Sequence, residues 1–125
     1  YYNMEKHKFE VECRIILLSR NPTNELRYSV AVTKDGDIFT QDINAEKGLI
    51  GSLGGFFESY FGLDASWVNP KVLSVLDKGK KITIFFYGEI PWDFSLSSGS
   101  WLPITEFDTS NEDFTLVLEA SRRAS

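Results

Sequence analysis

Apolar and charged residues alternate along the first part of the chain. From Phe9 to Leu17 the odd positions are apolar, and the even positions as far as Arg14 are charged. A period of two is typical of a strand with one buried face. Ile16 and Leu18 interrupt the polar side, so we expect the far end of this strand to be covered on both faces.

Two turn signals follow the first strand. The segment RNPTNE, residues 20–25, contains the proline and asparagine of a turn, and we expect a second strand at 26–33. KDGD, residues 34–37, is a hairpin signal of the Asp-Gly kind, which makes 37–41 the return strand. Three antiparallel strands are the simplest interpretation of this part of the chain.

A helical pattern comes next. Asn44 is placed to cap a helix that starts near Ala45, with Glu46 in its first turn. Apolar residues at spacings of three and four predict one broad apolar face, and Gly62 is placed to end the helix in the left-handed conformation. The residues of the predicted apolar face are Leu49, Ile50, Leu53, Phe56, Phe57, Tyr60 and Phe61.

The last part of the chain predicts a second hairpin and a second helix. Apolar runs at 72–76 and 81–87 flank the glycine turn DKGKK, and residues 91–103 are loop-like in composition. Thr109 and Glu112 have the spacing of a capping box. A short C-terminal helix follows and ends near two arginines, Arg122 and Arg123.

Length and charge narrow the class of protein. The 125 residues are enough for one compact core, and we expect a terminal tail at 1–8 and a single domain at 9–125. No run of about 18 apolar residues is present to span a membrane. The net charge of −5 argues against nucleic acid as a partner. Cys13 is the single cysteine, so no internal disulfide forms, and with no signal segment at the start we expect an intracellular, cytoplasmic chain.

The order of these elements resembles the Nudix superfamily from about Phe9 to Arg123. VAVTKDGDIF is similar to the family's strand-turn-strand, FFESYFGL to the end of its helix, and GSWLPITEF to its late tryptophan segment. The resemblance implies an α+β sandwich: a mixed β-sheet with a central helix and a short C-terminal helix. It also implies hydrolysis of nucleoside diphosphate-linked compounds with Mg²⁺.

The catalytic motif of that family is missing. With Gly62 as its final glycine, the motif's arginine falls on Gly55 and its first glutamate on Phe56. Ser59 and Tyr60 take the places of its paired glutamates. The same count puts non-acidic residues further upstream as well, where the family has a glycine and an isolated glutamate.

Those upstream residues are Gln41 and Lys47. Mg²⁺ needs clustered carboxylate oxygens to hold it against its hydration shell, and none of these side chains supplies one. Glu58 lies one residue before Ser59 and therefore about 100° away around the helix, so a slip of the register recovers one acid at most. We therefore predict no catalytic residues, no metal site and no cofactor.

Small residues gather on one side of the predicted helix. Each interior glycine costs about 1 kcal/mol of helix propensity relative to alanine, so another interaction should offset the loss. Two explanations stay open: close approach by the loop at 92–101, or a docking surface for another protein. The residues of this small-residue stripe are Gly48, Gly51, Ser52, Gly55, Ser59 and Gly62, of which the first five are our protein-interaction candidates.

Three further residues are candidates for bordering a ligand pocket. Trp92 and Trp101 flank a serine-rich loop, although packing at the edge of a core explains them too. Glu58 is the third. It is also one of four acids that would make a metal site only if the fold gathered them; these are Asp42, Glu46, Glu58 and Glu89.

The remaining chemically distinctive residues have structural explanations. His7 lies ahead of the first strand and is assigned to the terminal tail. Cys13 alternates with apolar residues and is expected to be buried. DKGKK, at 77–81, offers a basic tip that suits phosphate, but its turn chemistry explains it equally.

The leading hypothesis is a catalytically inactive Nudix-like domain that binds another protein or self-associates. The alternative is a divergent Nudix hydrolase or nucleotide-binding domain with a rearranged Mg²⁺ site. A third hypothesis is an unrelated α+β subunit whose elements follow the same order by coincidence, because fold analogy does not fix function.

Overall fold

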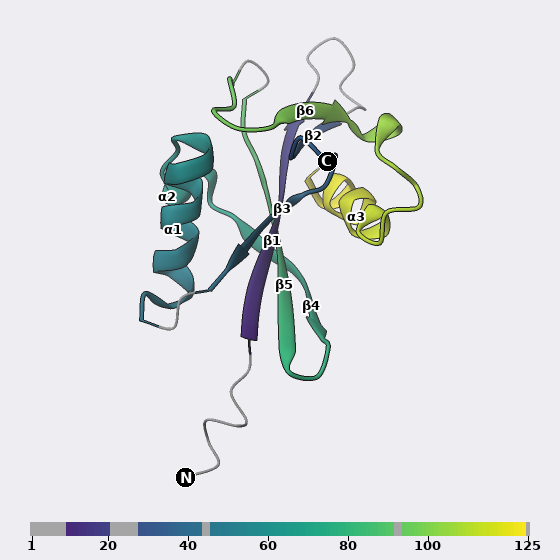
Figure 1. Cartoon of the computed structure of the whole chain (residues 1–125). Coiled ribbons are helices and arrows are strands. Elements are labelled where there is room, and N and C mark those ends of the chain that lie inside the picture. The colour runs from purple at the N-terminus through teal and green to yellow at the C-terminus, as the bar shows by residue number, and fades with distance from the viewer. Residues whose placement is uncertain (1–9, 21–27, 44–45, 92–93, 125) are drawn as a thin grey trace, which may run out of the picture.

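The computed structural model describes residues 10–20, 28–43, 46–91 and 94–124, which form a mixed sheet with a helix on each face (Figure 1). The predicted tail at 1–8 lies outside the described residues. The strands are β1 (Glu10–Arg20), β2 (Tyr28–Val32), β3 (Phe39–Asp42), β4 (Lys71–Asp77), β5 (Lys81–Glu89) and β6 (Ser100–Pro103). The helices are α1 (Gly48–Phe61), α2 (Ala65–Val68) and α3 (Phe114–Ala124), with a 3₁₀ turn at Ile104–Glu106.

Strand β1 is the centre of the sheet, whose order is β4-β5-β1-β2-β6. It pairs antiparallel with β2 through its second half and with β3 through its first half, and parallel with β5. The antiparallel pairing of β1 with β2 agrees with the sequence prediction, whereas the pairing of β3 with β1 was not predicted. The parallel pairing is new, and the predicted hairpin between β2 and β3 is reduced to a bridge between Val32 and Ile38.

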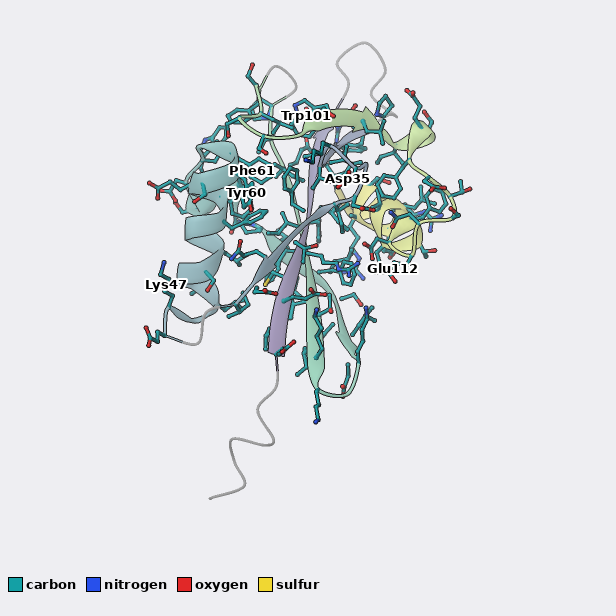
Figure 2. All side chains as sticks on the ribbon, in the orientation of Figure 1. Asp35, Lys47, Tyr60, Phe61, Trp101 and Glu112 are labelled. Carbon is teal, nitrogen blue, oxygen red and sulfur yellow. The ribbon has the colours of Figure 1, made fainter. Side chains whose placement is uncertain are left out.

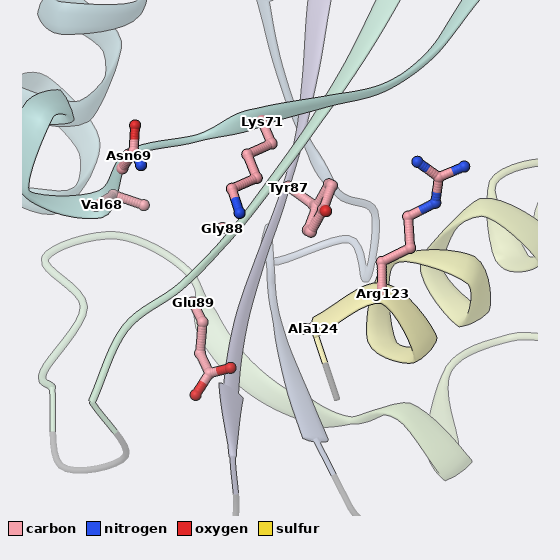
Figure 3. Close-up of a pocket in the computed structure, with 8 residues that line it drawn as sticks. All are labelled: Val68, Asn69, Lys71, Tyr87, Gly88, Glu89, Arg123 and Ala124. Atoms are coloured by element: carbon pink, nitrogen blue, oxygen red, sulfur yellow. The ribbon is translucent and has the colours of Figure 1, made fainter.

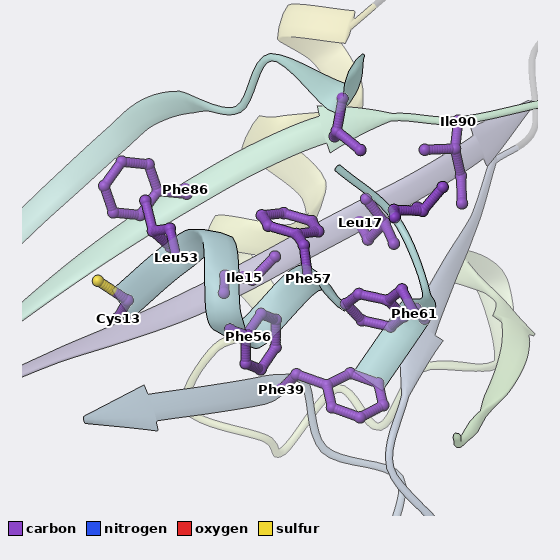
Figure 4. Close-up of a cluster of buried hydrophobic side chains, with 13 residues drawn as sticks. Cys13, Ile15, Leu17, Phe39, Leu53, Phe56, Phe57, Phe61, Phe86 and Ile90 are labelled. Carbon is purple, nitrogen blue, oxygen red and sulfur yellow. The ribbon is translucent and has the colours of Figure 1, made fainter. Parts of the chain in front are cut away.

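Alternate residues of β1 enter two separate cores. Cys13, Ile15 and Leu17 face α1, whereas Ile16 and Leu18 face α3. All five are almost completely buried, as expected for a central strand covered on both sides. Figure 4 shows the first of these cores, in which the aromatic side chains of α1 pack over β1, β3 and β5.

Helix α1 ends as predicted but begins later. Gly62 adopts φ 65° and its N–H donates to the Glu58 carbonyl over 3.1 Å, a left-handed C-cap. The predicted start near Ala45 is wrong, because the helix begins at Gly48 after Lys47, which makes no side-chain cap. The predicted cap, Asn44, lies outside the described residues.

The apolar face of α1 is narrower than its sequence suggests. Leu53, Phe56, Phe57 and Phe61 are buried against the sheet. Ile50 is 84% exposed, and two further members of the predicted face, Leu49 and Tyr60, are also exposed. The sheet covers only one stripe of the helix, so apolar residues at its margins stay in solvent.

Two elements were missed by the sequence patterns. Strand β6 lies within the segment predicted as loop and pairs with β2, where Trp101 is opposite Ala31. Helix α2 follows α1 and packs so tightly on β5 that a Cβ at Gly88 would lie 2.6 Å from Val68 Cγ1. Glycine is therefore required at position 88 by close approach.

The capping-box prediction for α3 is wrong. The helix begins at Phe114, and Asn111 rather than Thr109 precedes it as the capping side chain, with its Oδ1 accepting from the Asp113 N–H at 2.8 Å. The predicted arginines, Arg122 and Arg123, do occupy its last turn. Among the described helices, none is long and apolar enough to cross a membrane.

Candidate functional site

A groove of about 320 Å³ runs along α1 beside β3. Lys47 lies at the start of the helix and Tyr60 near its other end, so the groove follows most of its length (Figure 2). Residues from three consecutive segments meet there: β3, the turn after it and α1. The groove is lined by Gln41, Lys47, Gly51, Ser52, Gly55, Phe56, Ser59 and Tyr60.

In the register predicted from Gly62, six of these eight residues fall at conserved positions of the Nudix motif. The opening glycine and isolated glutamate correspond to Gln41 and Lys47, and the remaining four positions are on the helix. None of the eight lining residues has a carboxylate, and one is a lysine. A hard divalent cation requires oxygen ligands with negative charge, so the side chains of this groove do not fit Mg²⁺.

Phe56, which the predicted register places at the motif's first glutamate, packs in the aromatic core. Its side chain is 2% exposed and its ring lies 4.9 Å from Tyr60, 5.5 Å from Phe61 and 6.1 Å from Phe39, centroid to centroid. Figure 4 shows three of these rings clustered between α1 and β3. The position of the family's first glutamate is thus part of the aromatic core, where an ionised side chain would be strongly disfavoured.

The small-residue stripe is open toward the groove. Gly51, Gly55 and Ser59 are exposed, whereas Ser52 is buried. A Cβ added at Gly55 would meet no described atom within 4 Å, and one at Gly51 would lie 3.2 Å from Lys47 Cβ. Gly48 has φ 72° and so is needed for its backbone conformation.

The loop that was one of two explanations for the stripe contacts α1 elsewhere. Ser97 Oγ donates to the Tyr60 carbonyl at the last turn of the helix. Trp101 Nε1 donates to the Phe94 carbonyl over 3.0 Å, and its ring packs at the margin of the α1 core. Trp92 lies outside the described residues. Within the described part of this loop, no atom lies within 4 Å of a Cβ at Gly55.

The four acids proposed as alternative metal ligands are not brought together. Among the described residues, no group of three or more histidine, cysteine or acidic side chains has the arrangement of a metal site. Glu58 lines a separate depression with Asp64, whose carboxylate accepts hydrogen bonds from Ser66. Glu89 lies 3.9 Å from Arg20 in an ion pair. His7 lies outside the described residues.

Cys13 is fully buried in the α1 core. Burial raises the pKa of its thiol to about 11, because the thiolate would lose its hydration. A thiol in this state is not a nucleophile at neutral pH.

A buried ionic cluster on the opposite face was not predicted. Arg14 on β1 lies 2.6 Å from Asp113 and 2.9 Å from Glu112 at the start of α3, and 3.4 Å from Glu12. Glu12 also accepts from Thr83 Oγ1 at 2.9 Å. The Arg14 and Asp113 side chains are both largely shielded, so this cluster holds α3 against the sheet.

The pKa values of two acids in that cluster, Asp113 and Glu12, are shifted in opposite directions. Burial raises the pKa of Asp113 despite the neighbouring Arg14 charge. Burial also acts to raise the pKa of Glu12, but hydrogen bonds from Thr83 and Lys81 and the charge of Arg14 lower it overall. Because Arg14 neutralises both acids, its loss would leave them buried without a counter-charge.

A third depression, of about 280 Å³, lies between α2, β5 and the end of α3 (Figure 3). Lys71 and Tyr87 enter it from neighbouring strands, and Arg123 borders it from α3. Arg123 Nε lies 3.5 Å from Glu119, so its charge is already partly neutralised. Of the four acids considered as metal ligands, only Glu89 lines this depression, and the docking and ligand-pocket candidates lie elsewhere or outside the described residues.

Comparison with known proteins identifies the fold. No protein-family model and no curated protein sequence matches the chain. Among solved structures, the Nudix domain of Shewanella oneidensis NrtR, complexed with ADP ribose, aligns with a TM-score of 0.66 at 10% identity, covering 94% of this chain and 89% of that domain.

Two further structures agree. The C-terminal domain of mouse MUTYH, in its complex with human PCNA, aligns with a TM-score of 0.63 at 12% identity, covering 93% of this chain and 91% of that one. A MutT/nudix family protein from Enterococcus faecalis gives 0.58 at 15% identity, over 77% of this chain and 44% of that one. At these identities the likeness concerns architecture and not activity. The chain therefore has the Nudix fold, an α+β sandwich around a mixed sheet.

Proposed function

We propose that this chain is a non-catalytic Nudix-fold module that binds another protein through the groove beside α1. The observation that carries the proposal is the lining of that groove. It gathers six motif positions but offers glycines, hydroxyls, aromatic rings and a lysine in place of carboxylates. Acid-dependent metal chemistry has no ligands there, whereas a surface of small and aromatic residues is suited to contact with a polypeptide.

The glycines support contact with a backbone. Gly51 and Gly55 each lower the helix propensity by about 1 kcal/mol relative to alanine, and within the described residues no packing against Gly55 offsets that loss. Tyr60 borders the same groove and is 38% exposed. Exposed tyrosines are enriched at protein interfaces because a rigid ring contributes a large contact area.

The MUTYH domain is an example of this fold in complex with a protein partner, and it supports the proposal by analogy alone. The partner here is another protein or a second copy of the chain. The single cysteine favours an intracellular setting.

A pair of matched glycine variants tests the docking surface. Neither Gly54 nor Gly55 has a described atom within 4 Å of an added Cβ, and both are interior to α1. Alanine at either position should raise the free energy of unfolding by about 1 kcal/mol. Only Gly55 lines the groove, so only Gly55→Ala should weaken association.

Association is measured in two ways: sedimentation of the purified chain, and quantitative mass spectrometry of proteins retained from the native source on each immobilised variant. Partners kept by the wild type and Gly54→Ala but lost by Gly55→Ala are expected. If Gly55→Ala lowers stability, the stripe packs within its own fold. If both variants associate as the wild type does, this groove is not the docking surface.

A second candidate function is binding of a nucleoside diphosphate-linked compound without hydrolysis. Lys47 lines one end of the groove and the Tyr60 ring the other, so an elongated compound would place its phosphates at the lysine and its base on the ring. Calorimetric titration with ADP ribose should then show saturable binding that Lys47→Ala weakens. Unchanged binding in that variant would remove this candidate.

Catalysis is tested separately. A panel of nucleotide sugars, dinucleotides and nucleoside triphosphates should show no turnover with Mg²⁺ or Mn²⁺, because the acids of the motif are replaced. Turnover that Glu58→Gln abolishes would show that the non-catalytic part of the proposal is wrong and that a rearranged site exists.

A further inference from the structure

The edge strands of the sheet differ in length and in the polarity of their side chains. Strand β6 is four residues long and contains Pro103, which cannot donate to a further strand. Strand β3 is also four residues long and is polar after Phe39. Strand β4 is the long edge, seven residues, and among the described residues it pairs only with β5. A long edge with apolar side chains is the feature that most proteins avoid unless another chain pairs with it.

The side chains of β4 divide between the two faces of the sheet. Val72 is opposite Phe86, and Val75 is opposite Ile84, so both valines lie on the α1 face. They are 52% and 56% exposed. This face of the edge therefore presents an uncovered pair of β-branched side chains.

The other face of β4 has a lysine at each end, with Leu76, 38% exposed, between them. Lys71 is opposite Tyr87, which belongs to the α3 core. Lys78, one residue beyond the strand, lies near enough to α3 that its charge, after the hydrogen bond and charge of Arg14, helps to lower the pKa of Glu112. No ion pair joins Lys71 or Lys78 to a described residue. The hairpin at 71–89 has four lysines and two acids, although the whole chain has a net charge of −5.

The turn after β4 determines which backbone groups face outward. The Lys78 N–H donates to the Lys81 carbonyl over 2.8 Å, which makes them a hydrogen-bonded pair. Hydrogen-bonded and non-hydrogen-bonded pairs alternate along an antiparallel ladder. The next pair, Asp77 with Ile82, therefore directs its amide groups away from the ladder, and so does Val75 two residues earlier. Val75 and Asp77 present N–H and C=O groups to the open edge.

We propose that β4 is a docking strand for an extended segment of a partner protein in which apolar and acidic residues alternate. Such a segment would pair with the outward amides of Val75 and Asp77. Because side chains alternate between faces, its apolar residues would contact the exposed valines while its acids lie beside Lys71 and Lys78. This mode of recognition combines main-chain hydrogen bonds with side-chain selection.

A second copy of the chain fits this edge less well. An antiparallel β4–β4 pair would keep each face continuous, so the lysines of both copies would lie on the same face without acids between them. The irregularity in pairing between Val72 and Ser74 limits the regular edge to the residues after it for either kind of partner, so charge is what distinguishes the two. A strand of a different protein that has acidic residues would place negative charges beside these lysines, which a second copy of β4 would not do.

The test uses a synthetic ten-residue peptide in which valine alternates with glutamate, titrated into the whole chain by nuclear magnetic resonance. Peptide binding should slow hydrogen exchange at the Val75 and Asp77 amides. Val75→Glu should weaken binding about tenfold or more, since it replaces an apolar contact by a like charge. The matched change at another exposed aliphatic residue, Ile50→Glu, should leave it unchanged.

Two control peptides distinguish the contribution of backbone hydrogen bonds to peptide binding from that of side-chain charge. A valine–lysine peptide should not bind, and a valine–glutamate peptide with its pairing amides N-methylated should bind at least about tenfold more weakly. Equal binding of either control, or no binding of the first peptide, would overturn the proposal. So would a dimer of the chain that Val75→Glu abolishes. Gly55→Ala should leave peptide binding intact, so this edge and the α1 groove can fail independently.

Discussion

Returning a glutamate to the position of the family's first acid should destabilise the fold. Phe56 is 2% exposed, and four other aromatic rings lie within 6.1 Å of its ring, centroid to centroid. Truncation of a buried phenylalanine costs about 3 to 5 kcal/mol, and an unpaired carboxylate adds the loss of its hydration. Phe56→Glu should therefore remove at least about 4 kcal/mol, a large part of the roughly 5 to 15 kcal/mol available to a domain.

Urea denaturation followed by circular dichroism and tryptophan fluorescence measures this loss. Ser59→Glu is the matched control, because Ser59 is exposed at another acid position and a surface change there should stay within about 0.5 kcal/mol. Burial raises the folded pKa of the introduced glutamate, so its penalty should shrink as the pH falls and the side chain becomes neutral. A Phe56→Glu protein within about 1 kcal/mol of wild type would refute the reasoning that packing displaced the acid.

Three further variants or reagents check other parts of the structure. Gly88→Ala should lower the free energy of unfolding by about 1 to 3 kcal/mol in a urea titration, because its Cβ would lie 2.6 Å from Val68 Cγ1; an unchanged midpoint would contradict the close packing of α2 on β5. Arg14→Gln should cost about 3 to 5 kcal/mol near neutral pH by leaving Asp113 buried without its counter-charge. Since the folded pKa of Asp113 would then rise further above its unfolded value, that loss should diminish on acidification; a constant difference across pH would count against the ion pair. The Cys13 thiol, whose pKa burial raises to about 11, should react with a disulfide reagent only after urea unfolding, and rapid reaction of the native chain would show that it is accessible.

Local chemistry determined several elements from the sequence alone. Alternation predicted β1, and a single glycine predicted the left-handed end of α1 at Gly62. These features depend on residues near one another in the chain, where backbone conformation and side-chain burial follow a simple period. Helix starts were harder, because Asn111 and Thr109 both have the chemistry of a cap and tertiary packing selected the first.

The candidate site was predicted only in part. The register from Gly62 singled out residues that line one groove, and the small-residue stripe supplies part of its lining. The sequence did not show that Gln41 and Lys47 would meet Gly55 and Tyr60 across one groove. That meeting depends on where β3 pairs with β1, which is set by the packing of α1 on the sheet and not by any local pattern.

Only the tertiary structure decided the long-range partners. Arg14 meets Glu112 although 98 residues separate them, and β1 pairs in parallel with β5. The same arrangement leaves β4 as the long apolar edge. Periodicity reports which side of a strand is buried, but the choice of neighbouring strand is made by the summed packing free energy of the whole core, to which residues far apart in the sequence contribute together.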